Sequence, residues 1–222
     1  MTVKKIAILS PGDMGHAVGR ALSEHGFDIL THLEGRSQRT CALAKDAGFR
    51  ISATLNEVIH EADLLLAILV PANAETVAKE IALSLQETGE TTLIADCNAI
   101  SPMRSERIGR TIESAGGRYI DASIIGHPPG RAVPPRFYVS GHHADAMLEL
   151  DGKGIVVKNL GGDVGRASGI KMCYAALTKG TSTLQVALLT VAESLGLSAE
   201  LHDELACSQK VILRNMESGI PG

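Results

Sequence analysis

IAILSPGDMG, at residues 6–15, is the stretch of sequence on which the fold depends. Four aliphatic residues typical of a buried strand lead through a short turn into a segment with apolar residues at helical spacing. The turn occupies the position of a GxGxxG pattern, with Ser10 at the first glycine. Gly12 permits close approach of a pyrophosphate and Gly15 permits close packing of helix on strand, while the helix dipole attracts the anion. The alternative is a tight turn with a purely structural role.

Beyond this turn, short aliphatic runs alternate with amphipathic stretches, which is typical of βαβ units around a mostly parallel sheet. The sequence predicts strands at residues 5–9, 27–33, 50–52, 63–70, 92–96, 118–123, 137–140 and 155–158. Thr54 and Glu57 form a capping box that predicts a helix start, and Ser101 before Pro102 predicts another. We therefore expect an α/β fold, a Rossmann-type doubly wound sheet.

After about residue 160 the sequence becomes rich in glycine and then helical, with almost no strand signal. This change predicts two domains: a dinucleotide-binding domain over residues 1–161 and a small all-α domain over residues 162–222.

Composition excludes several classes of protein. The net charge is −4, and Lys and Arg are scattered, so neither nucleic acid nor a membrane surface is an expected partner. The four cysteines are far apart, and no stretch is long enough for a leader or a membrane span, so we expect a cytoplasmic protein. His142, His143 and Asp145 favour a surface turn over a metal site, and no serine lies on a GxSxG elbow.

The residues that follow the second strand predict the type of dinucleotide. An acid there pairs with a ribose 2′-hydroxyl, whereas arginine accommodates a 2′-phosphate. Arg36, Ser37 and Arg39 suit a phosphate, and Glu34 alone argues for the diol, so the sequence favours NADP over NAD. The alternative is that both arginines are solvated charges and that Ser37 only caps a helix.

Lys171 is the only charged residue within residues 167–178. A helix that is apolar on nearly every face is expected to be buried, and an ammonium there needs a polar cavity or a partner. Such a lysine can act as general acid or base beside a nicotinamide. The alternative is a lysine whose aliphatic stem reaches the surface.

Together these features resemble the β-hydroxyacid dehydrogenase superfamily, which includes 3-hydroxyisobutyrate dehydrogenase and the NADP-binding part of 6-phosphogluconate dehydrogenase. The residues of these motifs are most similar to those of the superfamily's 6-phosphogluconate dehydrogenase-like branch. Residues 10–15 resemble the family's GxGxMG turn, and residues 35–37 resemble its NADP-type Asn-Arg-Ser/Thr. The remaining motifs are Leu69-Val70-Pro71, residues 96–102, residues 121–127 for Asp-Ala-Pro-Val-Ser-Gly-Gly, and residues 162–171 for GxxGxGxxxK. The resemblance covers most of the chain.

The resemblance implies roles for individual residues. It places the catalytic lysine at Lys171. The cofactor-binding residues that we expect are Ser10, Pro11, Gly12, Asp13, Met14, Gly15, Arg36, Ser37, Arg39, Val70, Pro71 and Asn98. The substrate-binding residues that we expect are Ser123, Gly126, His127 and Tyr174, and no metal is expected. Family dimers interlock through their C-terminal helices, which implies a homodimer.

Three departures from the family pattern alter the substrate pocket. Ile125 replaces a substrate-binding serine, His127 replaces the second glycine, and Ala175 replaces an asparagine four positions after the lysine. Tyr174 or His127 supplies the missing polar contact, or each is simply packed. The short helical segment is either a reduced domain or one whose usual last helices are missing.

The sequence thus predicts an NADP-dependent dehydrogenase that transfers hydride between the nicotinamide and a small hydroxy acid or its keto form. A sugar phosphate is not the expected substrate, because no basic cluster accompanies the motifs. One alternative is an imine reductase on the same scaffold. Another is an NADP(H)-binding sensor or scaffold without catalysis.

Overall fold

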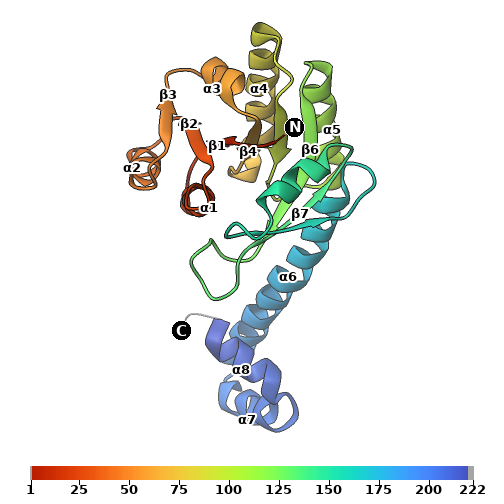
Figure 1. The fold of residues 1–222 in the computed structure, drawn as a ribbon. Helices are drawn as coiled ribbons and strands as arrows, with labels where there is room; N and C mark the ends of the chain where they lie inside the picture. Colours follow the sequence, from red (N-terminus) through yellow and green to blue (C-terminus); the bar gives the residue numbers. More distant parts are fainter. Residues whose placement is uncertain (1, 220–222) are drawn as a thin grey trace. The chain divides into compact units, whose positions relative to one another are not determined.

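A computed structural model describes residues 2–219 of the chain (Figure 1). The chain divides into two compact units between Lys171 and Met172. The first unit is an α/β domain. Its strands are β1 (Lys5–Leu9), β2 (Asp28–His32), β3 (Arg50–Ser52), β4 (Leu64–Ala67), β5 (Leu93–Asp96), β6 (Arg118–Ile125), β7 (Arg136–Ser140) and β8 (Val156–Asn159). Its helices are α1 (Asp13–Ser23), α2 (Gln38–Asp46), α3 (Leu55–Glu61), α4 (Ala74–Thr88) and α5 (Pro102–Ser114), with 3-10 segments η1 (Pro71–Asn73) and η2 (Ala144–Leu150).

The strands form one sheet in the order β3-β2-β1-β4-β5-β6-β7-β8. All neighbouring pairs are parallel except β6 and β7, which pair antiparallel from Asp121 opposite Ser140 to Ile125 opposite Arg136. The chain leaves β1 for β2 on one side and later returns to β4 on the other. This reversal beside β1 is the switch point at which doubly wound sheets bind their ligands, so the predicted Rossmann-type fold is confirmed.

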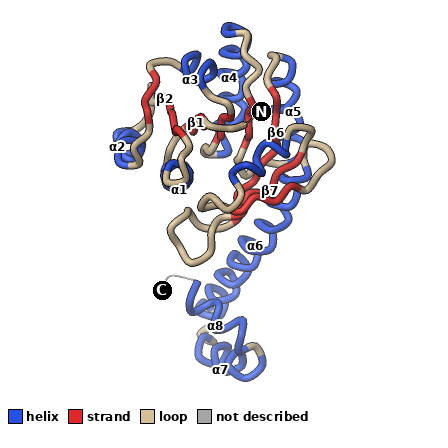
Figure 2. Tube along the Cα trace, in the orientation of Figure 1, coloured by secondary structure: helices blue, strands red, loops and turns tan. Residues whose placement is uncertain are grey.

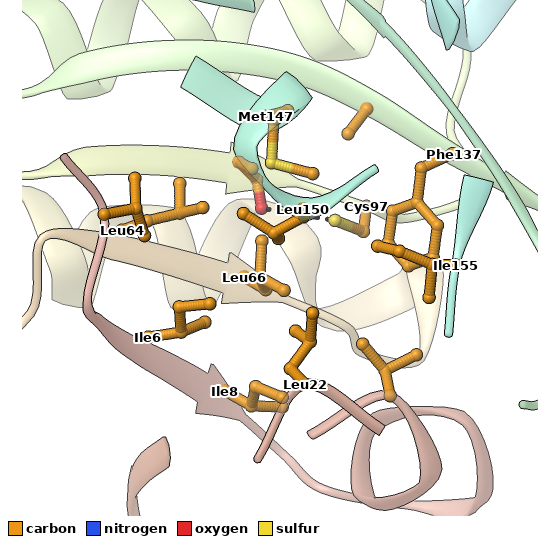
Figure 3. Close-up of a cluster of buried hydrophobic side chains, with 14 of the residues drawn as sticks. Ile6, Ile8, Leu22, Leu64, Leu66, Cys97, Phe137, Met147, Leu150 and Ile155 are labelled. Atoms are coloured by element: carbon orange, nitrogen blue, oxygen red, sulfur yellow. Dashed lines mark hydrogen bonds between the residues drawn. The ribbon is translucent and has the colours of Figure 1, made fainter. Parts of the chain in front are cut away.

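Helices cover both faces of the sheet (Figure 2). On one face, Ile6, Ile8 and Leu66 pack with α1, α2 and η2, and Figure 3 shows this cluster. On the other face, Ala7, Leu9 and the strands beside them pack against α3, α4 and α5. Because β1, β4 and β5 are buried on both faces, their sequences are nearly continuous aliphatic runs. These runs are the pattern from which the sequence predicts the three strands.

Each predicted strand overlaps an observed one, with differences at the ends. The predicted strand over residues 63–70 stops at Ala67, because residues 68–70 leave the sheet and line a cavity described below. The helix starts also differ in detail. Thr54 caps α3 by accepting a hydrogen bond from the Glu57 amide at 3.2 Å, whereas Ser101 occupies the N-cap of α5 without a side-chain cap.

The second unit is helical. Helix α6 (Arg166–Ser194) begins in the first unit, and its remainder belongs to the second unit with α7 (Ser198–Ser208) and α8 (Lys210–Gly219). The expectation that the helix around Lys171 is buried is wrong for the single chain. Beyond Lys171, Ala192 is the one buried residue of α6, because too little of the chain packs on this helix to cover it. Among the helices within residues 2–219, none has the length and hydropathy that crossing a bilayer demands.

The division between the units falls ten residues beyond the change of sequence texture at residues 161 and 162. The first turns of α6 belong to the first unit because hydrogen bonds attach them to its sheet. The amides of Gly165 and Ser168 donate to Asp121, and the amide of Ala167 donates to Ser140. Glycine-rich sequence therefore marks the approach to the helix rather than the limit of the sheet domain.

Candidate functional site

A cavity of about 530 Å³ lies at the switch point beside β1. Three loops line it: the turn from β1 to α1, the connection from β2 to α2, and the segment after β4. These loops follow the carboxyl ends of adjacent parallel strands, which brings residues from distant parts of the sequence together. The predicted residues that line the cavity are Ser10, Gly12, Asp13, Met14, Gly15, Arg36, Ser37 and Val70.

The turn between β1 and α1 is built to admit an anion. Gly12 is the N-cap of α1 and makes no side-chain cap, so the first amides of the helix are available to a ligand. A Cβ on Gly12 would have Ser10 O as its nearest atom, at 3.9 Å, so the backbone is open there. A Cβ on Gly15 would meet Ile8 Cγ2 at 3.3 Å, which explains the need for glycine at the helix–strand contact. Both glycines have the surroundings that the sequence predicts.

Ser10 adopts a backbone conformation that favours glycine. Its φ is 56°, in the left-handed region, and the Gly12 amide donates to its carbonyl at 2.6 Å. Among the residues that the structure describes, no other residue except glycine has a positive φ. The chain therefore keeps the geometry of the glycine-rich turn although its first glycine is absent.

The connection after β2 places a cationic side chain, that of Arg36, at the wall of the cavity. Arg36 lines the cavity, and its Nε is buried without a hydrogen-bond partner among the described residues. Ser37 also lines the cavity while capping α2, since its Oγ accepts from the Thr40 amide at 3.2 Å. Glu34 is absent from the lining: its side chain is 85% exposed and lies 3.5 Å from His32 Nε2. The acid that argued for NAD is thus not part of the cavity lining.

Arg39 is placed differently from the prediction. It is not part of the cavity lining, and its guanidinium forms an ion pair with Asp13, in the first turn of α1. This exposed pair links the start of α1 to α2. Pro11 is buried in the turn and Pro71 begins η1, and neither lines the cavity.

Asn98 lies behind the cavity wall instead of facing into it. The residue is 3% exposed, its Nδ2 donates to Asp96 Oδ1 at 2.7 Å, and its Oδ1 accepts from the Leu69 amide at 2.7 Å. Because Leu69 lines the cavity, Asn98 holds the wall in place. Burial raises the pKa of Asp96 to about 6, although the hydrogen bonds from Asn98 favour its charged form.

Lys171 reaches the same edge of the sheet from α6. Its Nζ donates to the carbonyl of Ile124 at 2.7 Å, close to the carboxyl end of β6. Strands β1, β4, β5 and β6 are parallel, so this carbonyl lies at the edge from which the cavity-lining loops emerge. The alternative of a lysine that only reaches solvent does not fit, because its ammonium meets a buried backbone acceptor.

The predicted substrate residues differ in burial, and they belong to both units. Ser123 is fully buried, with an Oγ that has no partner in the part of the chain described, whereas Gly126 and His127 are exposed at the end of β6. Ile125, at the family's serine position, is 3% exposed. Tyr174 belongs to the second unit, on the part of α6 beyond Lys171, and is 45% exposed. Their roles toward a substrate remain predictions.

Six lining residues are not among the predicted cofactor-binding residues: Gly35, Thr40, Ile68, Leu69, Asn73 and Val77. Of these, Gly35 and Leu69 lie within motifs that the sequence analysis quotes. Thr40 could have been predicted as a lining residue, because it lies one helical turn after the N-cap Ser37. Asn73 and Val77 belong to η1 and α4, and no motif marks them as lining residues. Together the open amides of α1, the cationic side chain of Arg36 and the apolar segment after β4 fit the pyrophosphate, the 2′-substituent and the flat rings of a nicotinamide dinucleotide.

No three His, Cys, Asp or Glu side chains gather as metal ligands within residues 2–219. In the sequence cluster considered earlier, Asp145 accepts a hydrogen bond from Asn159 Nδ2 at 2.7 Å. Burial lowers the pKa of the neighbouring His143. Asp145 therefore makes a structural hydrogen bond to Asn159.

Comparison with known proteins agrees with this geometry. The model of the family described as the NAD binding domain of 6-phosphogluconate dehydrogenase matches residues 5–148. An uncharacterized 28.5 kDa protein of Methanothermus fervidus is 26% identical over 90% of this chain and 76% of its own length. Mouse mitochondrial 3-hydroxyisobutyrate dehydrogenase is 24% identical over 96% of this chain, which spans 62% of the mouse protein.

Solved structures share the fold. The 3-hydroxyisobutyrate dehydrogenase of Mycobacterium tuberculosis, solved with L-serine, has a TM-score of 0.76 at 20% identity and covers 100% of this chain and 76% of its own. An imine reductase of Myxococcus stipitatus in complex with NADP+ has a TM-score of 0.70 at 20% identity, covering 96% and 75%. At this level of identity the likeness concerns the fold alone.

Proposed function

Because the chain belongs to the family of the NAD-binding domain of 6-phosphogluconate dehydrogenase, within the β-hydroxyacid dehydrogenase superfamily, we propose that it is an NADP-dependent oxidoreductase. It transfers hydride between the nicotinamide and a small hydroxy acid or its keto form. The observation that carries this proposal is the position of Lys171, whose ammonium meets Ile124 O at the sheet edge that also bears the cavity.

Residues of this chain would hold the dinucleotide at three points. The open amides after Gly12 would bind the pyrophosphate, and Arg36 and Ser37 would contact the 2′-phosphate. Val70, 66% exposed, would support the nicotinamide half. The unpaired Nε of Arg36 and the absence of Glu34 from the cavity lining support NADP over NAD. Arg39 would join the phosphate site only by leaving Asp13.

When bound, the nicotinamide supplies or accepts the hydride. Lys171 would hold a proton at its Nζ and give it to the carbonyl oxygen of a keto acid, or take it from the hydroxyl in the reverse direction. Ile124 O keeps this ammonium at the carboxyl end of β6. Loss of the lysine would therefore stop proton transfer without removing any of the groups that hold the dinucleotide.

The test combines turnover with binding. We expect the parent protein to oxidise NADPH faster than NADH with at least one member of a panel of keto acids, and to bind NADPH more tightly. Lys171→Ala should abolish turnover and leave the Kd for NADPH nearly unchanged. Lys179→Ala is the matched control, since Lys179 is an exposed lysine of the same helix and should have no effect.

Turnover retained by Lys171→Ala would overturn the catalytic assignment, and tighter binding of NADH would overturn the cofactor assignment. Two other functions have support. An imine reductase is favoured by the shared fold of such enzymes, and imines belong in the same panel. A sensor or scaffold protein is favoured by the altered residues 123–127, and NADPH binding without turnover on any member of the panel would select it.

A further inference from the structure

Asp121, on β6, is a buried carboxylate to which the proposed function assigns no role. The residue is 1% exposed. Its Oδ1 accepts from Ser105 Oγ at 2.9 Å and from Ser168 Oγ at 2.6 Å. Its Oδ2 accepts from Ser140 Oγ at 3.0 Å, from the Gly165 amide at 2.8 Å and from the Ser168 amide at 3.1 Å. The carboxylate thus joins α5, β6, β7 and the first turn of α6.

Three of these five donors belong to the start of α6. The first amides of a helix have no partner within the helix and carry the positive end of its dipole, so a buried anion is well placed there. A local Ser or Asp would cap the helix at less cost, since burial of a carboxylate is expensive unless donors surround it. A carboxylate supplied by the sheet does more than cap the helix, because it fixes the helix on the strand.

Lys171 follows Ser168 by three residues, so both side chains emerge from the same face of α6. That face meets β6 twice: at Asp121 through Ser168, and at Ile124 through Lys171. Gly165 permits this approach, because its φ is +104° and a Cβ there would lie 3.3 Å from Pro102 Cβ. The helix is therefore attached to the strand at two points, one turn apart.

We infer that Asp121 is a positioning residue for Lys171. It fixes the register of α6 on β6 and thereby holds the lysine ammonium at the carboxyl end of the strand. This inference rests on the proposed function only for its catalytic consequence, since the attachment itself is independent of any reaction.

Two serines provide a matched pair of variants. Ser105 and Ser168 are both fully buried, and each donates its hydroxyl to Asp121 Oδ1. Only Ser168 lies on the helix that carries Lys171, whereas Ser105 lies on α5. Ser168→Ala and Ser105→Ala therefore both remove one hydrogen bond from the carboxylate, but only the first loosens α6. Their Tm values show how much general stability each loses.

The first measurement needs no cofactor. Lysines are acetylated with an amine-reactive reagent, and the rate at each lysine is measured by mass spectrometry. We expect Ser168→Ala to raise the rate at Lys171 several-fold and to leave Lys179 unchanged, while Ser105→Ala leaves both unchanged. Asp121→Asn should act like Ser168→Ala and more strongly, because an amide nitrogen cannot accept the hydrogen bonds made to the carboxylate.

The second measurement is turnover. Ser168→Ala should lower kcat about ten- to a hundredfold with KM and the Kd for NADPH nearly unchanged, because a small misplacement of a catalytic group slows the chemical step. Equal effects of Ser168→Ala and Ser105→Ala on labelling and kcat would overturn the inference and leave Asp121 a structural residue. Turnover retained by Lys171→Ala would instead overturn the proposed function, while the labelling result would still decide whether Asp121 positions the lysine.

Discussion

At the scale of single residues, hydrogen-bond partners separate residues that face the cavity from residues that support it. Asn98 has the identity expected of a cofactor contact, yet both ends of its amide are bound to Asp96 and Leu69. Asp96 lies at the end of β5 and is 4% exposed. The pairing of Asn98 with Asp96 is local, because the two residues are only 2 positions apart in the sequence. The hydrogen bond from the Leu69 amide depends on two loops meeting at the sheet edge, and no local sequence pattern predicts that contact.

The buried carboxylate of Asp96 predicts an unusual dependence of stability on pH. Burial raises its pKa from 3.8 to about 6, with Asp121 adding to the rise and Asn98 and Arg104 opposing it. The folded chain therefore binds this proton more tightly than the unfolded chain. The stability that this group contributes is present below about pH 4 and is lost as the pH rises through 6. A pKa difference of that size corresponds to roughly 3 kcal/mol of unfolding free energy.

We expect Asp96→Asn to gain unfolding free energy relative to the parent as the pH is raised from 4 to 7. Urea unfolding at a series of pH values measures this difference. Asp203→Asn is the control, because the Asp203 side chain is 90% exposed and should show little change. Parallel pH profiles for Asp96→Asn and the parent would contradict the assignment.

At the scale of elements, the connections of the sheet explain what the sequence reveals. Central strands are aliphatic because both faces are buried, so their positions could be predicted. The turn at Gly12 and Gly15 could be predicted too, since backbone geometry demands glycine there. The ion pair between Asp13 and Arg39 could not, because it joins elements that follow different strands. Nor does any local signal reveal that β7 runs antiparallel to β6.

The turn between β1 and α1 makes a prediction about Ser10. A left-handed conformation costs a residue with a Cβ about 1–2 kcal/mol, and the greater freedom of glycine in the unfolded chain offsets part of the gain. We expect Ser10→Gly to raise the unfolding free energy by about 0.5–1 kcal/mol, as measured by urea unfolding. Ser10→Ala keeps the strained backbone and removes only the hydroxyl, so it should show no gain. Equal stabilities for the two variants would mean that the turn is unstrained.

At the scale of the whole molecule, the second unit leaves much apolar surface uncovered. Exposed side chains include Leu177, Leu184 and Val191 on α6, Leu195 directly after it, and Val211 on α8. The sequence predicted a buried helix because its apolar residues occur on nearly every side, and burial in the single chain does not follow from that pattern. Folded chains rarely leave so much apolar surface exposed unless a partner covers it, which supports the homodimer that the family resemblance implies.

We expect sedimentation equilibrium to give twice the chain mass of 23.3 kDa. Leu184→Arg should shift the protein toward monomer, because a charge would have to be buried in the interface. Leu83→Arg is the matched control: Leu83 is 56% exposed on α4, in the first unit, and its replacement should leave the dimer intact. A parent protein that remains monomeric at all concentrations would exclude the homodimer.

The central place of β1 also affects the order of folding during synthesis. β1 leaves the ribosome before both of its partners, because β2 and β4 follow it in the chain. At translation rates of about 5–20 residues per second, one edge of β1 stays unpaired for several seconds. The turn that would hold the pyrophosphate is thus made before β4, the strand that completes the pairing of β1.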